Sequence, residues 1–305
     1  MFKHLLIPLD GSRLAEAALP AALFLAAALD AKVTLIHVIE HDPPQEIHGE
    51  RHLSDPEEAL QYLDEVAARV FRSGTEVARH VHGNKVRNVA RSIAEHGEEF
   101  GSDLIVMCTH GRGGLRAWIF GRIAQQVVGL GSIPLLLVQP AGSDPQPAFC
   151  CRRLLVTLDG NPDHEQGLNL AASLAKACKA ELQMVMVVPD YKTLSGEDAV
   201  TAKILPRATI ALLELAQGEA EEYLRRQATR LQAAGVEAMA EVHRGDPVTT
   251  IVNIAKSKDI DLILLATHGK TGMDAFWSGS VTPIVASRTL VPILLFPVHG
   301  KVEES

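Results

Sequence analysis

The chain has 305 residues, of which 47% are apolar and 22% charged, and a formal net charge of −8. This length is typical of two domains, and the apolar content excludes a wholly disordered chain. Aromatic residues make up only 4% of the chain, and together with the acidic balance this argues against single-strand recognition and a large phosphate-backbone footprint. We therefore expect no nucleic-acid partner.

Signals for export or membrane insertion are weak. The opening residues, MFKHLLIPLD, lack a signal-peptide core, and the longest apolar stretch, residues 17–29, is broken by Pro20 and is too short to span a bilayer. The four cysteines show no metal-like spacing, and we expect Cys150 and Cys151 to be ordinary thiols, with a redox switch as the alternative. These features predict a cytoplasmic protein without membrane insertion.

Five short apolar runs, separated by helical patterns, form the first half. They lie near residues 4–9, 33–39, 76–82, 104–108 and 134–138. They are rich in Leu, Ile and Val and scarcely alternate, which is typical of strands buried on both faces of a parallel sheet. Ser12 is expected to cap a helix that reaches Leu25, and Asp55 to cap the next helix with Glu58 at capping-box spacing. Alternating strands and helices predict a doubly wound α/β sheet.

The second half repeats the first. HLLIPLDGS (4–12) recurs as RLLVTLDGN (153–161), and DLIVMCTHG (103–111) recurs as DLILLATHG (261–269). The offset between the copies grows from 149 to 161 residues before the second helix, which indicates a 12-residue insertion there, and then falls to 158. We predict domains at 1–140 and 151–298, joined by a linker rich in Pro, Gly and Ser at 141–150.

The loop after the fourth strand of the second half is the strongest candidate for a ligand site. Ligands of open parallel sheets bind beyond the carboxyl ends of the strands. This loop, 266–283, ends in Gly279-Ser280-Val281-Thr282 at the predicted start of a helix. Unpaired backbone N–H groups and the positive end of the helix dipole favour a phosphate at such a start. A serine that merely caps an ordinary helix is the alternative interpretation.

Over essentially its whole length the chain resembles a tandem universal stress protein. The nucleotide pattern of that family is Gly, two residues, Gly, nine residues, then Gly-Ser or Gly-Thr. The second half reads Ala266, two residues, Gly269, nine residues, Gly279-Ser280, so only the first glycine differs. The resemblance implies two five-stranded Rossmann-like domains with strand order 3-2-1-4-5.

The same resemblance assigns roles to residues of the second half. It implies that Asp159 binds the ribose or adenine and that Val187 lines the adenine pocket. A turn-forming Asp before Gly160 is the less favoured alternative for Asp159. The residues placed by the pattern around the phosphates are Ala266, Gly269, Gly279, Ser280, Val281 and Thr282.

The first half departs further from the pattern. It reads Cys108, two residues, Gly111, nine residues, Gly121-Arg122, with Asp10 and Val38 at the positions of Asp159 and Val187. Arg122 could pair with a phosphate or occupy its space. We therefore expect the second half to hold the principal site, and the site of the first half to be weakened, filled or specialised.

The resemblance implies a regulatory protein that binds ATP, ADP or AMP together with Mg²⁺ and acts on an unknown protein partner. A slow ATP hydrolase and a nucleotide-free scaffold are the alternatives, but neither half supplies a P-loop, a Rossmann glycine motif or a convincing general base, so no catalytic residue is assigned.

Two further expectations concern assembly and metals. The family pairs its domains about a two-fold axis, which implies that the tandem chain makes this pair internally. The strands ending at Val138 and Phe296 are expected to be edges that allow two chains to dimerise. His41, His48 and His52 could bind a metal, but a solvated loop is favoured and no metal ligand is assigned.

Overall fold

The computed structural model describes residues 1–43, 46–47, 50–71, 74–109, 121–130, 133–140, 148–161, 165–268 and 281–298. Its chain forms two compact units. One comprises Met1–Cys150 with Thr267–Ser305, and the other comprises Cys151–Ala266.

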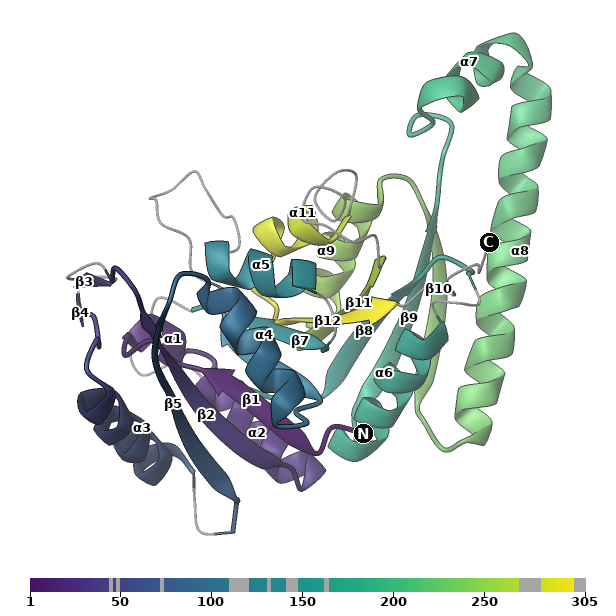
Figure 1. Ribbon diagram of the computed structural model, residues 1–305. Coiled ribbons are helices and arrows are strands. Elements are labelled where there is room, and N and C mark those ends of the chain that lie inside the picture. Colours follow the sequence, from purple (N-terminus) through teal and green to yellow (C-terminus); the bar gives the residue numbers. More distant parts are fainter. Residues whose placement is uncertain are drawn as a thin grey trace, which may run out of the picture. The chain divides into compact units, whose positions relative to one another are not determined.

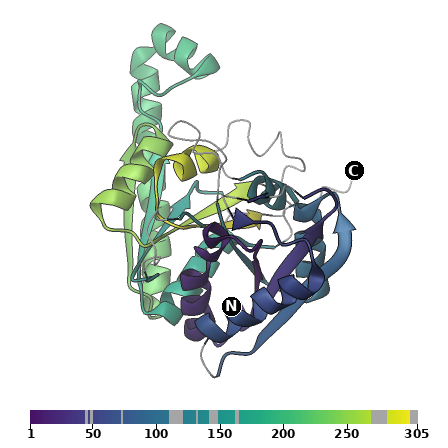
Figure 2. The same ribbon diagram turned by 90° about the vertical axis from the view of Figure 1, so that its left-hand side faces the viewer.

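The first repeat has the predicted alternation of strands and helices (Figures 1 and 2). Its strands are β1 (His4–Pro8), β2 (Lys32–Glu40), β5 (Val77–Val86), β6 (Leu104–Cys108) and β7 (Leu135–Val138). Its helices are α1 (Arg13–Glu16), α2 (Leu19–Leu29), α3 (Pro56–Val70), α4 (Val89–Glu99) and α5 (Arg122–Leu130). A short antiparallel pair, β3 (Glu46–Ile47) and β4 (Glu50–Arg51), precedes α3. The five predicted strand positions are therefore confirmed.

The second repeat follows the same plan. Its strands are β8 (Arg153–Leu158), β9 (Glu181–Val188), β10 (Ala238–Arg244), β11 (Leu262–His268) and β12 (Ile293–Val298). Its helices are α6 (Glu165–Cys178), α7 (Gly196–Ile204), α8 (Pro206–Ala233), α9 (Pro247–Ser257) and α11 (Val281–Arg288).

Both repeats have the strand order 3-2-1-4-5 that the resemblance implied. The orders are β5-β2-β1-β6-β7 and β10-β9-β8-β11-β12. Within the first repeat all neighbouring strands are parallel. Every residue of β6 is buried, as expected for a central strand covered by helices on both faces.

The expectation that β7 and β12 are free edges is wrong. The two strands pair antiparallel with each other, with Leu135 opposite Leu295 and Leu137 opposite Ile293. Their backbone groups are therefore bonded within the chain, so the argument for dimerisation of two chains through these strands does not hold. The sequence could not reveal this pairing because it joins residues more than 150 positions apart.

The predicted helix starts are confirmed, with one difference at each. The Ser12 hydroxyl accepts a hydrogen bond from the Ala15 N–H, but the helix is divided into α1 and α2, and Pro20 lies in the first turn of α2. Asp55 accepts hydrogen bonds from the first-turn N–H groups of α3. The Glu58 carboxylate binds the Arg51 guanidinium, with oxygen–nitrogen distances of 2.6 and 2.9 Å.

The predicted insertion lengthens a helix. The second helix of the second repeat, α8, has 28 residues, whereas the corresponding α3 has 15. Figure 1 shows α7 at the far end of α8, beyond the ends of β9 and β10. The additional turns therefore extend the second unit away from its sheet.

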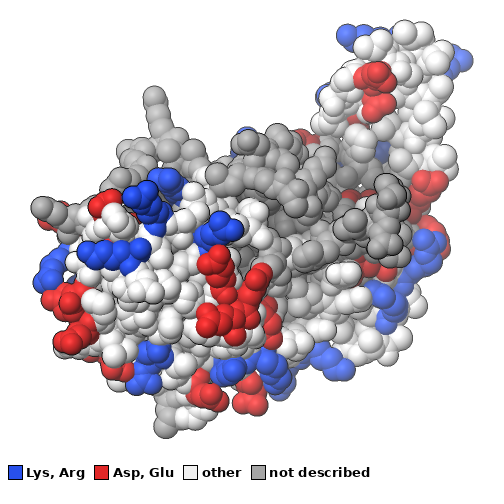
Figure 3. Space-filling view, viewed as in Figure 1, with Lys and Arg blue, Asp and Glu red and all other residues white. Residues whose placement is uncertain are grey.

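Acidic and basic side chains are interspersed on the described part of the face shown in Figure 3. None of the described helices is both long enough and apolar enough to cross a lipid bilayer.

Candidate functional site

A cavity of about 450 Å³ lies in the first repeat, where β1, β2 and β6 end. This is the edge of a parallel sheet at which ligands bind, and the volume lies within the range of small-molecule pockets. The residues that line it include Asp10, Ile36, His37, Val38, Glu40, His52, Arg87, Asn88, Met107, Cys108, Gly121 and Arg122. The structure thus brings Asp10, Val38, Gly121 and Arg122 together, whereas Gly111 lies outside the described residues.

The Asp10 carboxylate is held at this cavity by a tight turn. Its Oδ1 accepts hydrogen bonds from the Ser12 backbone N–H at 2.9 Å and from the Ser12 hydroxyl at 2.7 Å. Gly11, between them, has φ of +90°, and a Cβ there would lie 2.8 Å from Leu53 Cδ1. Both the backbone angle and the lack of space favour glycine, which fixes the direction in which the carboxylate leaves β1.

His37 joins two segments of the cavity wall. This residue of β2 is 1% exposed, and its Nδ1 lies 2.8 Å from the Leu9 carbonyl oxygen while Nε2 lies 3.1 Å from that of Leu53. Since carbonyl oxygens only accept hydrogen bonds, the ring must donate, and a neutral imidazole has one N–H to offer to these two carbonyl groups. His37 therefore positions the residue that precedes Asp10, a role that the sequence analysis missed.

His52 lines the same cavity with polar atoms that have no partner among the described residues. The side chain is 4% exposed, and neither ring nitrogen has a hydrogen-bond partner within the described part of the chain. Burial lowers the pKa of His52, a shift opposed by the nearby Glu40 carboxylate. A buried imidazole with both nitrogens unpaired is costly, and a polar ligand in the cavity would satisfy it.

The three loop histidines do not behave as one group. His41 is exposed and its Nδ1 lies 2.9 Å from the Asp42 carboxylate, whereas His52 is buried. His48 lies outside the described residues. The favoured interpretation of a solvated loop is therefore wrong for His52.

Cys108 and Arg122 replace the glycine and serine of the nucleotide pattern, and both line the cavity. Burial, reinforced by the Asp10 carboxylate, raises the pKa of the Cys108 thiol to about 12. Arg122 is exposed and begins α5 directly after Gly121. The described residues leave space at this edge. That the site of the first half is weakened, filled or specialised stays a prediction.

Arg87 and Asn88 also reach the cavity, and sequence analysis selected neither. Both follow β5, and the Asn88 side chain caps α4 by accepting a hydrogen bond from the Arg91 N–H at 3.0 Å. The sequence signal was present, since an asparagine before a helical pattern is a common cap. That the loop after the third strand reaches the cavity depends on the sheet order.

The predicted residues of the second repeat are only partly described. Asp159 is exposed after β8, and its Oδ1 accepts a hydrogen bond from the Asn161 N–H at 3.0 Å, the same turn as that of Asp10. Val187 on β9 and Ala266 on β11 are half-buried. These three residues belong to the second compact unit.

Val281 and Thr282 begin α11, and Thr282 is buried. This helix belongs to the first compact unit, and Gly269, Gly279 and Ser280 lie outside the described residues. The assembly of all these residues into one nucleotide site therefore stays a prediction.

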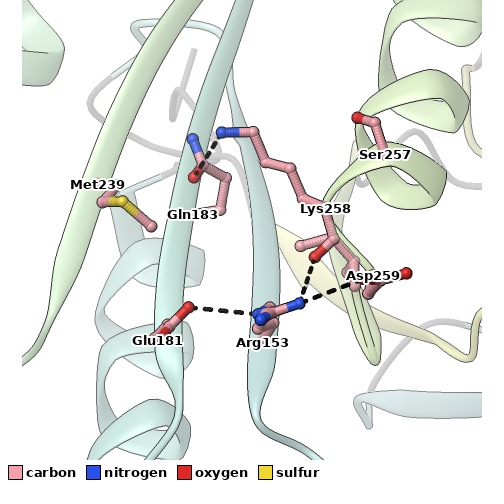
Figure 4. Close-up of a pocket in the computed structure, with 8 residues that line it drawn as sticks. Arg153, Glu181, Gln183, Met239, Ser257, Lys258 and Asp259 are labelled. Atoms are coloured by element: carbon pink, nitrogen blue, oxygen red, sulfur yellow. Dashed lines mark hydrogen bonds and ion pairs between the residues drawn. The ribbon is translucent and has the colours of Figure 1, made fainter.

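A second cavity, of about 310 Å³, lies in the unit Cys151–Ala266 (Figure 4). Its lining comprises Arg153, Glu181, Gln183, Met239, Ser257, Lys258, Asp259 and Ile260. Arg153 is already paired with Glu181 at 3.4 Å, with Asp259 at 3.5 Å and with the Lys258 carbonyl oxygen at 3.1 Å. Because β8 and β9 begin here, the cavity is at the amino edge of the sheet, away from the expected ligand edge. We interpret it as a structural ion-pair network.

The adjacent cysteines do not form a pair of equivalent thiols. Cys151 is buried, and its hydrogen bond lowers the pKa of Cys178, at the end of α6. Cys150 is half-buried, and all four cysteines are free thiols.

Comparison with known proteins identifies the family. The model of the universal stress protein family matches residues 1–139 and again residues 151–297. The universal stress protein MJ0531 of Methanocaldococcus jannaschii is 30% identical over 144 residues, which are 47% of this chain and 81% of that protein.

Solved structures share the fold over nearly the whole chain. A universal stress protein from Archaeoglobus fulgidus has a TM-score of 0.71 at 18% identity, with 98% of this chain and 97% of that chain covered. Protein PA1789 of Pseudomonas aeruginosa, described as functionally unknown, has a TM-score of 0.70 at 15% identity, with 97% and 93% covered. The two consecutive matches, the repeated strand order and the cavity at the carboxyl edge lead to one conclusion: the chain belongs to the universal stress protein family and carries two of its domains in tandem.

Proposed function

We propose that this chain is a cytoplasmic, nucleotide-responsive regulatory module that binds an adenine nucleotide and passes its bound state to a protein partner without catalytic turnover. Its two domains are 1–140 and 151–298, joined by 141–150. The observation that carries the proposal is the cavity at the carboxyl edge of β1, β2 and β6. Its volume and its mixture of apolar and polar walls suit a nucleoside with a phosphate attached.

The chemistry of the lining residues fits this ligand. Ile36, Val38 and Met107 supply apolar surface for a base, and the Asp10 carboxylate can accept hydrogen bonds from ribose hydroxyls. The unpaired ring nitrogens of His52 add a donor and an acceptor.

The phosphate end would lie where α5 begins. The N-terminal N–H groups of this nine-residue helix and the Arg122 guanidinium are both attractive to an anion. A second cation, Arg87, lines the same cavity.

We assign the principal affinity to the second repeat. Its pattern retains hydroxyl groups at Ser280 and Thr282, whereas the first repeat has Arg122 and Ala124 at those positions. The short side chain of Ser280 leaves room for phosphate oxygens beside the start of its helix. The longer side chain of Arg122 takes up part of that room in the first repeat. Mg²⁺ would accompany a bound triphosphate.

Calorimetric titration with Mg–ATP of wild type and of two reciprocal variants, Ser280→Arg and Arg122→Ser, tests this assignment. We expect one dominant site per chain. Ser280→Arg should weaken it at least tenfold, about 1.4 kcal/mol, whereas Arg122→Ser should leave it unchanged. Two equally tight sites, or loss of the dominant site in Arg122→Ser alone, would contradict the proposal that the second repeat holds the tighter nucleotide site. Absence of any heat would contradict nucleotide binding itself.

A further inference from the structure

Three histidines of the first unit, His80, His82 and His96, lie close together outside the lining of the nucleotide cavity. His80 and His82 are alternate residues of β5 and therefore share one face of that strand, and His96 lies on α4. One nitrogen from each ring lies within 4.8 Å of the other two. His82 Nδ1 and His96 Nε2 are 3.2 Å apart.

The position of one proton follows from the contacts of His96. Its Nδ1 lies 2.7 Å from the Ser92 carbonyl oxygen, and because a carbonyl cannot donate, Nδ1 carries the proton. The lone pair of a neutral His96 is then on Nε2, which faces His82. A histidine ligand whose other nitrogen donates to a backbone carbonyl is the usual arrangement at protein metal sites.

His80 contributes a polar atom that the described part of the chain leaves without a partner. Its Nε2 is buried and has no hydrogen-bond partner among the described residues. The rings also pack against Phe100, with centroids 5.0 Å from His80 and 5.4 Å from His96. Ring packing accounts for the apolar contacts but leaves the buried nitrogen unpaired, which is unfavourable. A bound cation would remove this cost.

The spacing suits a transition metal. Two nitrogens at 2.0–2.1 Å from a tetrahedral Zn²⁺ are about 3.3 Å apart, which is nearly the separation of His82 and His96. A rotation of the His80 ring would bring in the third nitrogen. Three imidazoles suit Zn²⁺, Co²⁺ or Ni²⁺, and the fourth position would hold water.

The charges around the cluster are compatible with a divalent ion. Burial and the neighbouring histidines lower the pKa of both His80 and His82, so the site disfavours the protonated form of each ring. The Glu99 carboxylate acts on both rings in the opposite direction, as Glu95 does on His82, and this negative charge would offset part of the charge of the ion.

The second repeat lacks the cluster. At offsets of 161 residues in the strand and 158 in the helix, the corresponding residues are Glu241, His243 and Ile254. Glu241 is instead paired with Lys258, and its other oxygen lies 3.1 Å from His243 Nε2. The second repeat thus fills this place with an ion pair, and His243 provides a matched control.

We propose that His80, His82 and His96 form a binding site for a divalent transition metal, Zn²⁺ in the first instance, which ties the outer strand β5 to α4. The site is independent of the nucleotide proposal, since none of the three histidines lines the nucleotide cavity.

The test uses the full chain, stripped with EDTA, dialysed and kept free of nucleotide. Zn²⁺ is titrated by calorimetry, and Co²⁺ by the visible absorption of its tetrahedral complexes. We compare wild type with His80→Gln and His82→Gln, because both positions are only half-buried and tolerate substitution better than His96. His243→Gln and His41→Gln are the controls.

We expect one Zn²⁺ per chain, with an affinity at least tenfold weaker in His80→Gln and in His82→Gln and unchanged in both controls. Co²⁺ should give tetrahedral absorption bands in wild type that both cluster variants lose. Failure of wild type to bind Zn²⁺ would overturn the proposal. Equal binding by wild type and both cluster variants would do so as well, and would point to other ligands in the chain.

Discussion

The Nδ1 of His37, a buried residue of β2, lies 2.8 Å from the carbonyl oxygen of Leu9, the residue that directly precedes Asp10. The same ring reaches Leu53 through its other nitrogen, at 3.1 Å. One side chain thus holds two segments of the cavity wall. Through its contact with Leu9 it also fixes the position of the Asp10 carboxylate at the cavity.

Replacing His37 by Leu keeps most of the buried volume but removes the ring N–H that lies between the Leu9 and Leu53 carbonyl groups. We expect a loss of about 1–3 kcal/mol in the free energy of unfolding, because buried carbonyl groups would lose a partner. Urea unfolding measures it, with His41→Leu at an exposed position as the control. A His37→Leu variant as stable as the control would show that these contacts contribute little.

The burial of His52 predicts a dependence of stability on pH. Its folded pKa is lower than the ordinary 6.5, so below pH 6.5 the unfolded chain binds more protons than the folded chain. Stability is therefore lost as the pH falls through that range, and His4, His80 and His82, whose pKa values are also lowered, act in the same direction.

His52→Gln removes one of these groups, so its free energy of unfolding should fall less than that of wild type between pH 7.5 and 5.5. Urea unfolding at the two pH values measures the difference. Equal losses in both proteins would mean that His52 does not titrate differently on folding.

Cys108 should be unreactive in the folded protein. With a pKa of about 12, roughly one thiol in ten thousand is ionised at pH 8, and the thiolate is the reactive form. Iodoacetamide labelling followed by peptide mass spectrometry should modify Cys150, which is half-buried, well before Cys108. Comparable labelling rates in the native chain would contradict this assignment, and denatured protein provides the control in which both react.

The Asp55 cap makes a local contribution to stability. Its Oδ1 accepts hydrogen bonds from Glu57 N at 2.9 Å and Glu58 N at 3.0 Å. Asp55→Ala should lower the free energy of unfolding by about 1 kcal/mol, whereas Ala at the exposed Glu98 should change it by less than about 0.5 kcal/mol. Thermal and urea unfolding of both variants measure this difference. Equal stability of the two variants would mean that the Asp55 cap does not stabilise the protein.

Features encoded over short stretches of chain were predictable from the sequence. The buried strands follow from uninterrupted runs of Leu, Ile and Val, and Ser12 and Asp55 cap helices as their side chains predict. The strand order came from the family resemblance, and the structure has it in both repeats.

Features that depend on packing between distant segments were not predictable. The pairing of β7 with β12 joins the last strand of each repeat, and no local sequence pattern predicts it. His52 occurs in a polar stretch typical of a solvated loop. Its ring nevertheless packs beside that of His37, a residue of β2, with the ring centroids 6.4 Å apart. Similarly, His80 and His82 become neighbours of His96 only when α4 packs beside β5.

The most direct test of the account is the nucleotide content of the protein as purified. The chain is denatured and removed, and the released small molecules are identified and counted by chromatography. We predict about one adenine nucleotide per chain, with the number of its phosphates indicating which form is resident. No nucleotide in the purified protein, followed by no heat on titration with Mg–ATP, would contradict nucleotide binding and favour a scaffold that works without a ligand.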